Sequence, residues 1–335
     1  MISILIKSFN RPFYLDRSLN SIFRFVEGDF FVKVLDDGTP EKYLNKIQKQ
    51  YPEIEILKSK NYKEKSKLVD QKSEINGFEI PTDLWITATN EADDYVLVIE
   101  DDVWFTDKIN LNQIVSEMKN YKIDLVKLGW LGNYKDDKHV KIHPLTENLD
   151  ATIPKNLFTS NQFVMDLFMY NKFKFFTILY KFGLVDNDTK RKYWVLNSIL
   201  MGLWKKEYWL QIWKDADGKV DEKQQLRNAA VWFHKNKKHE NLIARTKSEY
   251  LKTTFQSSAT NSYHRYGFDF DVDYFNFLIN EAWFRNEFDT MQDYPNDFSV
   301  KYFEQFFDEK IKKEEFRKWI EKFKQQYRNL GAEVD

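Results

Sequence analysis

Three consecutive acidic residues, Glu100, Asp101 and Asp102, follow an unbroken apolar run at residues 95–99. Such a run is typical of a strand buried on both faces, as in a parallel sheet. Open α/β sheets bind ligands at the carboxyl ends of their strands, where these acids would lie. Adjacent carboxylates raise one another's pKa unless a cation joins them, and Mn²⁺ or Mg²⁺ suits ligands that are all oxygen. The alternative is a solvated acidic turn after a core strand.

The first strand of this sheet is predicted at residues 2–7, which form another apolar run. The polar side chains of Ser8, Asn10 and Arg11 follow it, and Pro12 suits the first turn of a helix. Apolar residues then recur at helical spacing. Repeated strand–helix–strand units of this kind call for right-handed crossovers and a mostly parallel sheet.

A second strand is predicted at residues 30–35 and ends in Asp36, Asp37 and Gly38. Carboxylate oxygens at this position can bind the edge of a base or a ribose, and a glycine lets the backbone approach a ligand. The alternative for both acids is a helix cap combined with a turn, because aspartate is common in both.

The composition excludes several kinds of protein. A chain of 335 residues can bury a sizeable core, and its net charge of -1 argues against a strongly basic nucleic-acid binder. It has no cysteine, so disulfides and thiolate metal sites are excluded. No signal-peptide pattern is present, and no apolar run approaches the ~20 residues of a membrane span. We therefore expect a folded cytoplasmic protein without a membrane span.

Three segments resemble the donor-binding half of family 2 glycosyltransferases, which have the GT-A fold. They occur in the family's order within residues 1–128 and read IKSFNRPFYLDRSLNSIF, VLDDGTPEKYLNKI and YVLVIEDDVWF. The last segment has Glu-Asp-Asp where the family has its Asp-X-Asp (DXD) motif. The resemblance implies a nucleotide-sugar donor with Mn²⁺ or Mg²⁺ on its diphosphate. The chemistry agrees, because a pyrophosphate leaving group needs its growing charge neutralised.

The resemblance also implies roles for particular residues. Those assigned to the nucleotide sugar are Ser8, Asn10, Arg11, Asp36, Asp37 and Asp101. Asp36 would meet the base or the ribose. Asp102, together with Glu100, would bind the metal ion.

A further metal ligand is expected later in the chain, because GT-A enzymes often take one from a histidine or an aspartate. We assign it to His234, which follows an apolar run at residues 229–233 and precedes a lysine cluster. His264 is the rival. The alternative for His234 is a histidine bonded to a backbone carbonyl, since most histidines are not metal ligands.

An inverting transferase also needs a carboxylate to deprotonate the acceptor hydroxyl. In the family this acid lies beyond the metal-binding strand, near the start of a helix. Asp186 and Asp188 fit that position, although each could instead cap the helix. Asp166 and Asp215 are the other candidates.

Four other segments have less specific patterns. The lysine-rich residues 58–79 predict a long surface loop or lid. The aromatic residues 166–182 predict a core helix, and residues 208–213 (YWLQIW) predict a strand. The helical residues after 271 carry an apolar stripe that would pack on the catalytic domain or on a second subunit, so an oligomer could form there.

We thus predict an α/β protein with a GT-A-like, mostly parallel twisted sheet flanked by helices. A nucleotide-sugar-binding half spans residues 1–130, an acceptor-binding half residues 131–270, and a helical C-terminal region residues 271–335. The predicted activity is metal-dependent glycosyl transfer, with inversion, to the hydroxyl of a saccharide or glycan.

Three competing functions remain open. A phage-type transferase would modify hydroxymethylated bases in DNA, which its aromatic and lysine-rich acceptor half would suit. A sugar-phosphate nucleotidyltransferase would normally show a glycine-rich loop after the first strand, and SFNRP has no glycine. A non-catalytic module would bind nucleotide sugars regardless of metal.

Overall fold

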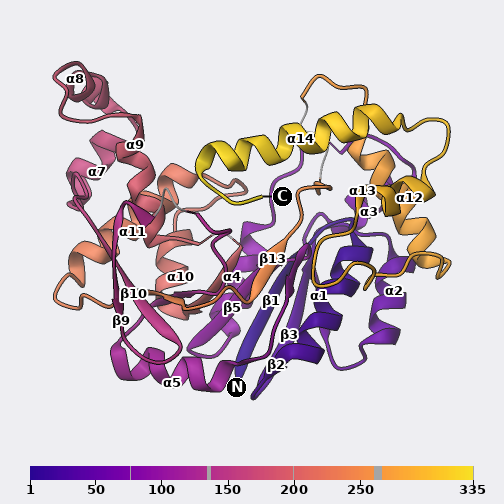
Figure 1. Cartoon of the computed structure of the whole chain (residues 1–335), viewed down its shortest axis with the longest axis horizontal. Coiled ribbons are helices and arrows are strands. Elements are labelled where there is room, and N and C mark those ends of the chain that lie inside the picture. Colours follow the sequence, from indigo (N-terminus) through magenta and orange to yellow (C-terminus); the bar gives the residue numbers. More distant parts are fainter. Residues whose placement is uncertain (76, 134–136, 199, 260–265, 335) are drawn as a thin grey trace.

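The computed structural model describes residues 1–75, 77–133, 137–198, 200–259 and 266–334 (Figure 1). Within these residues, helices cover both faces of a nine-stranded sheet. The strands, in spatial order, are β4 (Glu55–Lys58), β3 (Phe30–Asp36), β1 (Ile2–Ser8), β5 (Tyr95–Glu100), β11 (Met201–Lys205), β8 (Leu125–Lys127), β12 (Ile243–Thr246), β10 (Leu149–Pro154) and β9 (Val140–Pro144).

Seven of these nine strands run in one direction. β1 is parallel to β3 and β5, β3 is parallel to β4, and β8 is parallel to β12. Only β10 and β11, among the strands of this described sheet, are antiparallel to both neighbours. The predicted α/β class with a mostly parallel sheet is confirmed.

The apolar runs of the central strands are buried because they feed two cores at once. In β1, Ile4 and Ile6 belong to the core on one face and Leu5 to the core on the other. In β5, Leu97 and Val98 divide in the same way. Side chains alternate between the faces of a strand, so a strand covered on both sides needs apolar residues at every position.

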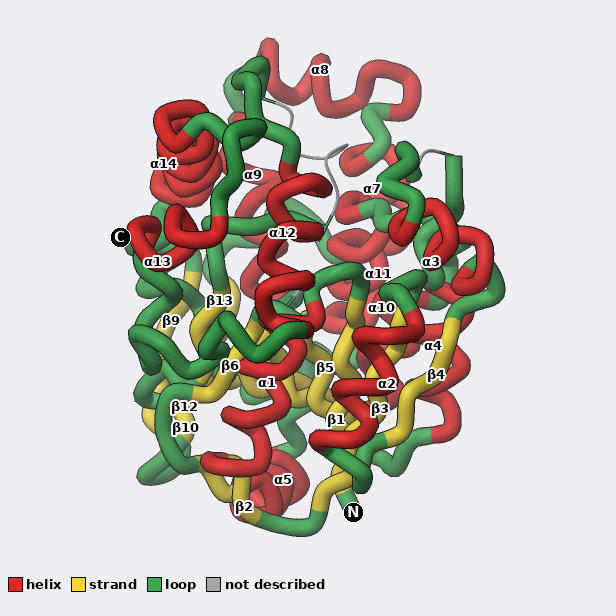
Figure 2. Tube along the Cα trace, turned by 90° about the vertical axis from the view of Figure 1, so that its right-hand side faces the viewer, coloured by secondary structure: helices red, strands yellow, loops and turns green. Residues whose placement is uncertain are grey.

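Helices from both ends of the chain cover the first face, and Figure 2 shows α1 and α2 in front of the strands. The helices contributing to this core are α1 (Pro12–Phe25), α2 (Glu41–Gln50), α5 (Leu111–Tyr121), α12 (Val272–Phe284), α13 (Val300–Phe303) and α14 (Lys313–Leu330). Those contributing to the core on the opposite face are α4 (Thr82–Glu91), α7 (Gln162–Met169), α10 (Lys206–Trp213) and α11 (Glu222–Lys235).

Short elements complete the described chain. Two small sheets pair β6 (Val103–Phe105) with β13 (Leu251–Thr253) and β2 (Val26–Glu27) with β7 (Ile109–Asn110). The remaining helices are α3 (Tyr62–Asp70), α8 (Phe175–Lys181), α9 (Asn187–Arg191) and the 3-10 turns η1 (Lys172–Lys174), η2 (Lys192–Leu196) and η3 (Glu304–Phe306). No helix in the described ranges combines the length and apolar character that a membrane crossing requires.

The C-terminal helices belong to the main body of the chain. Phe316, Trp319 and Phe323 of α14 are buried in the same core as Ile4 of β1. The apolar stripe predicted after residue 271 therefore packs on the sheet of its own chain. In Figure 1, α14 crosses above the strands, on the side where β1 and β5 end.

Two of the predictions for individual segments are wrong. Residues 58–79 are not one long loop, because α3 forms within them and Lys65 is buried. Residues 208–213 are helical, since Tyr208, Trp209, Ile212 and Trp213 are buried at the spacing of one helix face. The aromatic side chains favoured a strand by propensity, but their period is that of a helix.

Candidate active site

The predicted polar residues lie at the carboxyl edge of the parallel strands. β5 ends at Glu100, which lies beside Lys7 of β1 in the parallel register. In the next pair, Ser8 of β1 lies beside Asp36 of β3. The two aspartates after Glu100 form the turn into β6. The prediction that these residues share one edge of the sheet is therefore met.

Arg11 clamps the two aspartates of this turn. Its Nη1 donates to Asp102 Oδ2 at 2.7 Å and its Nη2 to Asp101 Oδ1 at 2.5 Å. Asp101 Oδ2 also accepts from the backbone N–H of Phe9, at 3.0 Å. Arg11 precedes α1, so the start of this helix and the end of β5 are held together by an ion triad that is almost fully buried.

Burial dominates the electrostatics of this triad. It raises the pKa of Asp101 to about 7 and raises the pKa of Asp102, and in both cases the positive charge of Arg11 opposes the rise. Burial also acts to lower the pKa of Arg11, but the charges of Asp101 and Asp102 outweigh it. A further positive charge bound nearby would therefore favour the ionised forms of Asp101 and Asp102.

Glu100 has its own cation in Lys7. The ammonium of Lys7 lies 3.3 Å from Glu100 Oε1, and 4.7 Å and 5.5 Å from the ring centres of Trp85 and Trp213. Aromatic faces attract a desolvated cation, so the two tryptophan rings add to the attraction of Glu100 for the buried Lys7 ammonium. The sequence analysis missed this residue, although a lysine within an apolar strand run was a usable signal.

A carboxylate oxygen of the ion triad lacks a hydrogen-bond partner. Asp102 Oδ1 is buried and accepts no hydrogen bond from the residues that the structure describes. Three carboxylates, when ionised, face the two cations Lys7 and Arg11, which leaves one uncompensated negative charge. A buried, unpaired carboxylate oxygen is costly, and a hard divalent ion bound through one or two carboxylates would satisfy it. The residues thus fit the predicted Mn²⁺ or Mg²⁺ at Asp102.

Asp36 organises the backbone of its own loop. Its Oδ1 accepts from the N–H groups of Gly38 and Thr39, at 3.0 and 2.8 Å, and its Oδ2 accepts from the Thr39 hydroxyl at 2.6 Å. Its side chain is fully buried. The structure therefore gives Asp36 the role of a turn residue, which was the alternative to contact with a base or ribose.

We expect Asp36→Ala to destabilise the fold as well as the site. The substitution would remove the acceptor of three buried donors, which are the N–H groups of Gly38 and Thr39 and the Thr39 hydroxyl. Each donor left unsatisfied lowers the free energy of unfolding by about 1–3 kcal/mol. Denaturant unfolding should show a loss of several kcal/mol, whereas the exposed neighbour Asp29→Ala should show almost none. If the Asp36→Ala variant instead kept its stability and bound the donor more weakly, the result would support direct contact between Asp36 and the nucleotide.

Asp37 and Asn10 are held by elements distant in sequence. Asp37 Oδ2 lies 2.5 Å from the buried ammonium of Lys65 on α3. Asn10 has a left-handed backbone, with φ of 52°, and Asn280 Nδ2 of α12 donates to both its carbonyl and its Oδ1, each at 3.1 Å. No sequence signal links Asn280 to Asn10, since 270 positions separate them.

Tyr327 of α14, which was not among the residues predicted from the sequence, is close enough to these acids for their charges to affect its hydroxyl. Burial raises its pKa to about 12, and the negative charges of Glu100 and Asp102 add to the shift. Its ring lies 4.7 Å from that of Phe255, centre to centre. Within the described chain its hydroxyl forms no hydrogen bond. A neutral tyrosine hydroxyl beside the acids is thus available to donate to a ligand.

The predicted histidine ligand lies elsewhere. His234 occupies the last turn of α11, and its Nδ1 is 3.0 Å from Ser160 Oγ. Across the described ranges, no three His, Asp or Glu side chains are grouped so that they could hold a metal ion. The set of Glu100, Asp102 and His234 is therefore not assembled. The rival, His264, falls outside the described residues.

The candidate general bases have structural partners. Asp186 caps α9 in a reciprocal arrangement with Thr189, which is the capping alternative, and Asp188 is exposed in the first turn. The side chains of Asp166 and Asp215 both lie near Arg227, at 2.8 and 3.8 Å. Figure 1 shows α7, α8 and α9 together at one end of the molecule. None of the four acids is hydrogen-bonded or ion-paired to the described acids at the end of β5.

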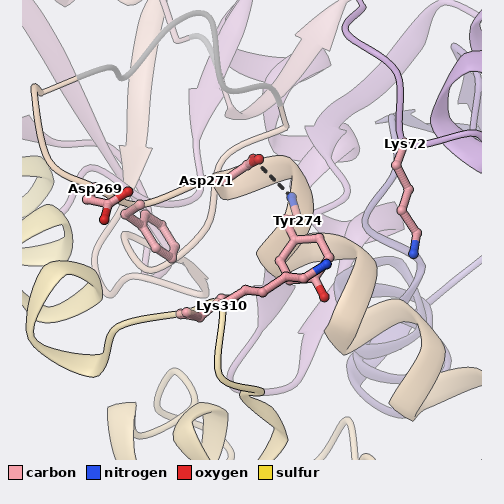
Figure 3. A pocket seen from close by; sticks show the side chains of 7 residues that line it. Lys72, Asp269, Asp271, Tyr274 and Lys310 are labelled. Carbon is pink, nitrogen blue, oxygen red and sulfur yellow. Dashed lines mark hydrogen bonds between the residues drawn. The ribbon is translucent and has the colours of Figure 1, made fainter.

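A separate pocket of about 420 Å³ lies at the start of α12 (Figure 3). Its lining residues are Lys72, Asp269, Phe270, Asp271, Tyr274, Lys310 and Ile311. Asp271 caps α12 by accepting from the N–H of Tyr274, and Lys310 lies 5.1 Å from the centre of the Tyr274 ring. Two aspartates and two lysines line this pocket, so their formal charges cancel and favour neither an anion nor a cation.

Comparison with known proteins gives only distant similarity. No protein-family model matches the sequence, and no curated protein matches it. One structure of S. aureus TarS is 12% identical over 97% of this chain and 73% of that chain, with a TM-score of 0.43. Glucosyl-3-phosphoglycerate synthase from Mycobacterium tuberculosis, in complex with Mn²⁺, uridine diphosphate and phosphoglyceric acid, is 10% identical over 73% of this chain and 67% of that chain, with a TM-score of 0.34.

A third similar structure is the bifunctional glycosyltransferase WbbM, which is 10% identical over 85% of this chain and 51% of that chain, with a TM-score of 0.36. These three proteins are GT-A-type glycosyltransferases. At such low similarity, the function has to be inferred from the residues of this chain.

Proposed function

We propose that this protein is a glycosyltransferase that binds a nucleotide sugar at the carboxyl edge of its parallel strands. The observation that carries this proposal is the buried Asp102 Oδ1 just after β5, which has no hydrogen-bond partner among the described residues and lies within a cluster of three carboxylates and two cations. A site of this kind calls for a cation, and a donor diphosphate would share that cation.

The cation proposed is Mn²⁺ or Mg²⁺, held by Asp102 with Glu100 beside it. When bound, it would neutralise the charge that grows on the departing diphosphate. Arg11 fixes the Asp102 carboxylate by bonding its Oδ2, so Oδ1 is not engaged by the arginine and could bind the ion. The rigid buried triad thus preorganises the carboxylate, so little reorganisation is needed during the reaction.

The other residues at the edge would bind and orient the donor. Asn10, fixed by Asn280, and Asp37, fixed by Lys65, line the loops after β1 and β3, where a nucleoside would lie. Asp36 supports that pocket by holding its loop. Tyr327 would donate its hydroxyl to a phosphate or sugar oxygen from the side of α14.

The proposed reaction is direct displacement by an acceptor hydroxyl, with inversion at the sugar carbon. A carboxylate would take the proton of that hydroxyl. The default acceptor is a saccharide or glycan, and hydroxymethylated DNA is the alternative.

A panel of nucleotide sugars tests this function directly. We expect one donor to raise the melting temperature in the presence of Mn²⁺ or Mg²⁺, since a ligand at a hundred times its Kd adds about 2.7 kcal/mol. EDTA should abolish the shift, and slow donor hydrolysis should accompany it. Binding that ignores EDTA would contradict the metal assignment. Formation of a nucleotide sugar from a sugar phosphate and a nucleoside triphosphate would instead identify a nucleotidyltransferase.

A further inference from the structure

Residues 167–185 carry no acidic side chain, although acids are frequent elsewhere in the chain. The segment lies between Asp166 and Asp186, and its charged residues are Lys172, Lys174 and Lys181. It contains the last three residues of α7 together with η1 and α8, and Figure 1 shows α8 at the outer end of the molecule. We call residues 167–185 the basic arm.

The apolar side chains of the basic arm divide between two environments. Phe175, Phe176 and Leu179 are half-buried and pack against the core on the α7 side of the sheet. On the exposed side, Phe173 is 90% exposed and Phe182 is 76% exposed. The remaining large exposed apolar residues of the arm are Tyr170, Ile178, Tyr180 and Leu184. The prediction that this aromatic segment is core is therefore wrong for its outer half.

The backbone holds Phe173 in this outward position at some cost. Phe173 has φ of 53° and Lys174 has φ of 58°, both in the left-handed region that non-glycine residues rarely adopt. A non-glycine residue in this region is strained, and strain of this kind collects at functional segments. Because the Phe173 ring is exposed, its burial within this chain does not offset the backbone strain of the turn.

We propose that the basic arm docks the protein on the surface of an anionic lipid membrane. Phenylalanine, tyrosine and aliphatic side chains would enter the boundary between headgroups and acyl chains, and the lysines would meet the lipid phosphates. α8 has seven residues and is about 10 Å long, so it would lie in the interface rather than cross it. This docking function is additional to glycosyl transfer and does not depend on it.

Charge selects the membrane over a second copy of the chain. Two arms packed against each other would bring three lysines against three, with no carboxylate within the arm to compensate. An anionic lipid surface supplies the missing negative charge. Nucleic acid would also supply phosphates, but the exposed aliphatic residues Ile178 and Leu184 have neither a hydrogen-bonding group nor a ring to stack on bases.

Sedimentation with vesicles tests the proposal on the full-length protein. We expect binding to vesicles of two parts phosphatidylcholine and one part phosphatidylglycerol, and little binding to phosphatidylcholine alone. Each lysine near an anionic surface is worth about a factor of five, so Lys172→Gln, Lys174→Gln and Lys181→Gln together should weaken binding on the order of a hundredfold. Phe173→Ser with Phe182→Ser should also weaken it, because both rings are exposed and their loss does not disturb the core.

Matched controls separate the arm from general surface chemistry. Lys301, Lys313 and Lys322 are exposed outside the arm, so changing these three to Gln removes the same charge. Tyr121→Ser removes an exposed ring elsewhere. Both control variants should bind vesicles as the wild type does. Equal loss in the arm and control variants, or no binding to anionic vesicles, would overturn the proposal. Self-association or DNA binding that the Phe173→Ser and Phe182→Ser changes abolish, without vesicle binding, would assign the arm to that partner instead.

Discussion

Asp102→Asn is expected to lower glycosyl transfer on the order of a thousandfold and to abolish the metal-dependent part of donor binding. Asp102 Oδ1 is buried and has no hydrogen-bond partner in the part of the chain that the structure describes, so the amide would replace a negatively charged metal ligand by a weak one. The measurement is kcat with the best donor, together with thermal shift by that donor with and without Mn²⁺.

The fold should survive this change. Burial raises the pKa of Asp102, which means that the folded protein disfavours its ionised form, so a neutral isostere should not destabilise the fold. The melting temperature without ligand is therefore expected to stay the same or to rise. Asp107→Asn, an exposed aspartate five positions later, is the matched control and should leave activity unchanged. Near-normal turnover of the Asp102→Asn variant with Mn²⁺ would refute the metal site.

Arg11→Met is expected to destabilise the protein by about 3–5 kcal/mol, because it leaves two buried carboxylates without their shared cation. Equilibrium unfolding in urea measures this loss. The matched control is Arg285→Met, which removes an arginine from the exposed ion pair with Glu287 and should cost less than about 1 kcal/mol.

A double variant separates charge from packing in the triad. Adding Asp101→Asn to Arg11→Met removes one of the two buried carboxylate charges that Arg11→Met leaves unpaired. The double variant should therefore recover part of the lost stability, with an interaction free energy between the two substitutions of about 0.5–3 kcal/mol. Added Mg²⁺ should raise the melting temperature of Arg11→Met more than that of the wild type, because a metal ion can replace the missing cation. Strict additivity of the two substitutions would show that the ion triad does not contribute as the geometry indicates.

The sequence was most informative about the parallel strands. Residues 95–99 predicted a strand buried on both faces and residues 2–7 another strand of the same sheet, and β5 and β1 are adjacent interior strands of the sheet. Because parallel strands end at one edge, the acids after β5 and the polar residues after β1 had to lie together. These conclusions depend on local periodicity and direction, which a single sequence carries.

Local chemistry alone did not decide the roles of individual acids. Asp36 had two interpretations, and its bonds to Gly38 and Thr39 select the turn. Asp186 likewise proved to be a cap. Aspartate serves turns, caps and ligands with the same two oxygens, so only the positions of the surrounding donors distinguish these roles.

The sequence by itself determined that this is an α/β protein with acids at the carboxyl edge of a parallel sheet. Only the tertiary structure showed that Arg11 joins Asp101 to Asp102 and that Phe173 is exposed. It also placed Tyr327 of α14 where the charges of Glu100 and Asp102 affect its hydroxyl. The periodicity of a sequence shows which face of a helix or strand is apolar, because the spacing of residues along the chain determines the face on which each side chain lies. It does not report which elements meet, because that depends on how all the faces pack at once.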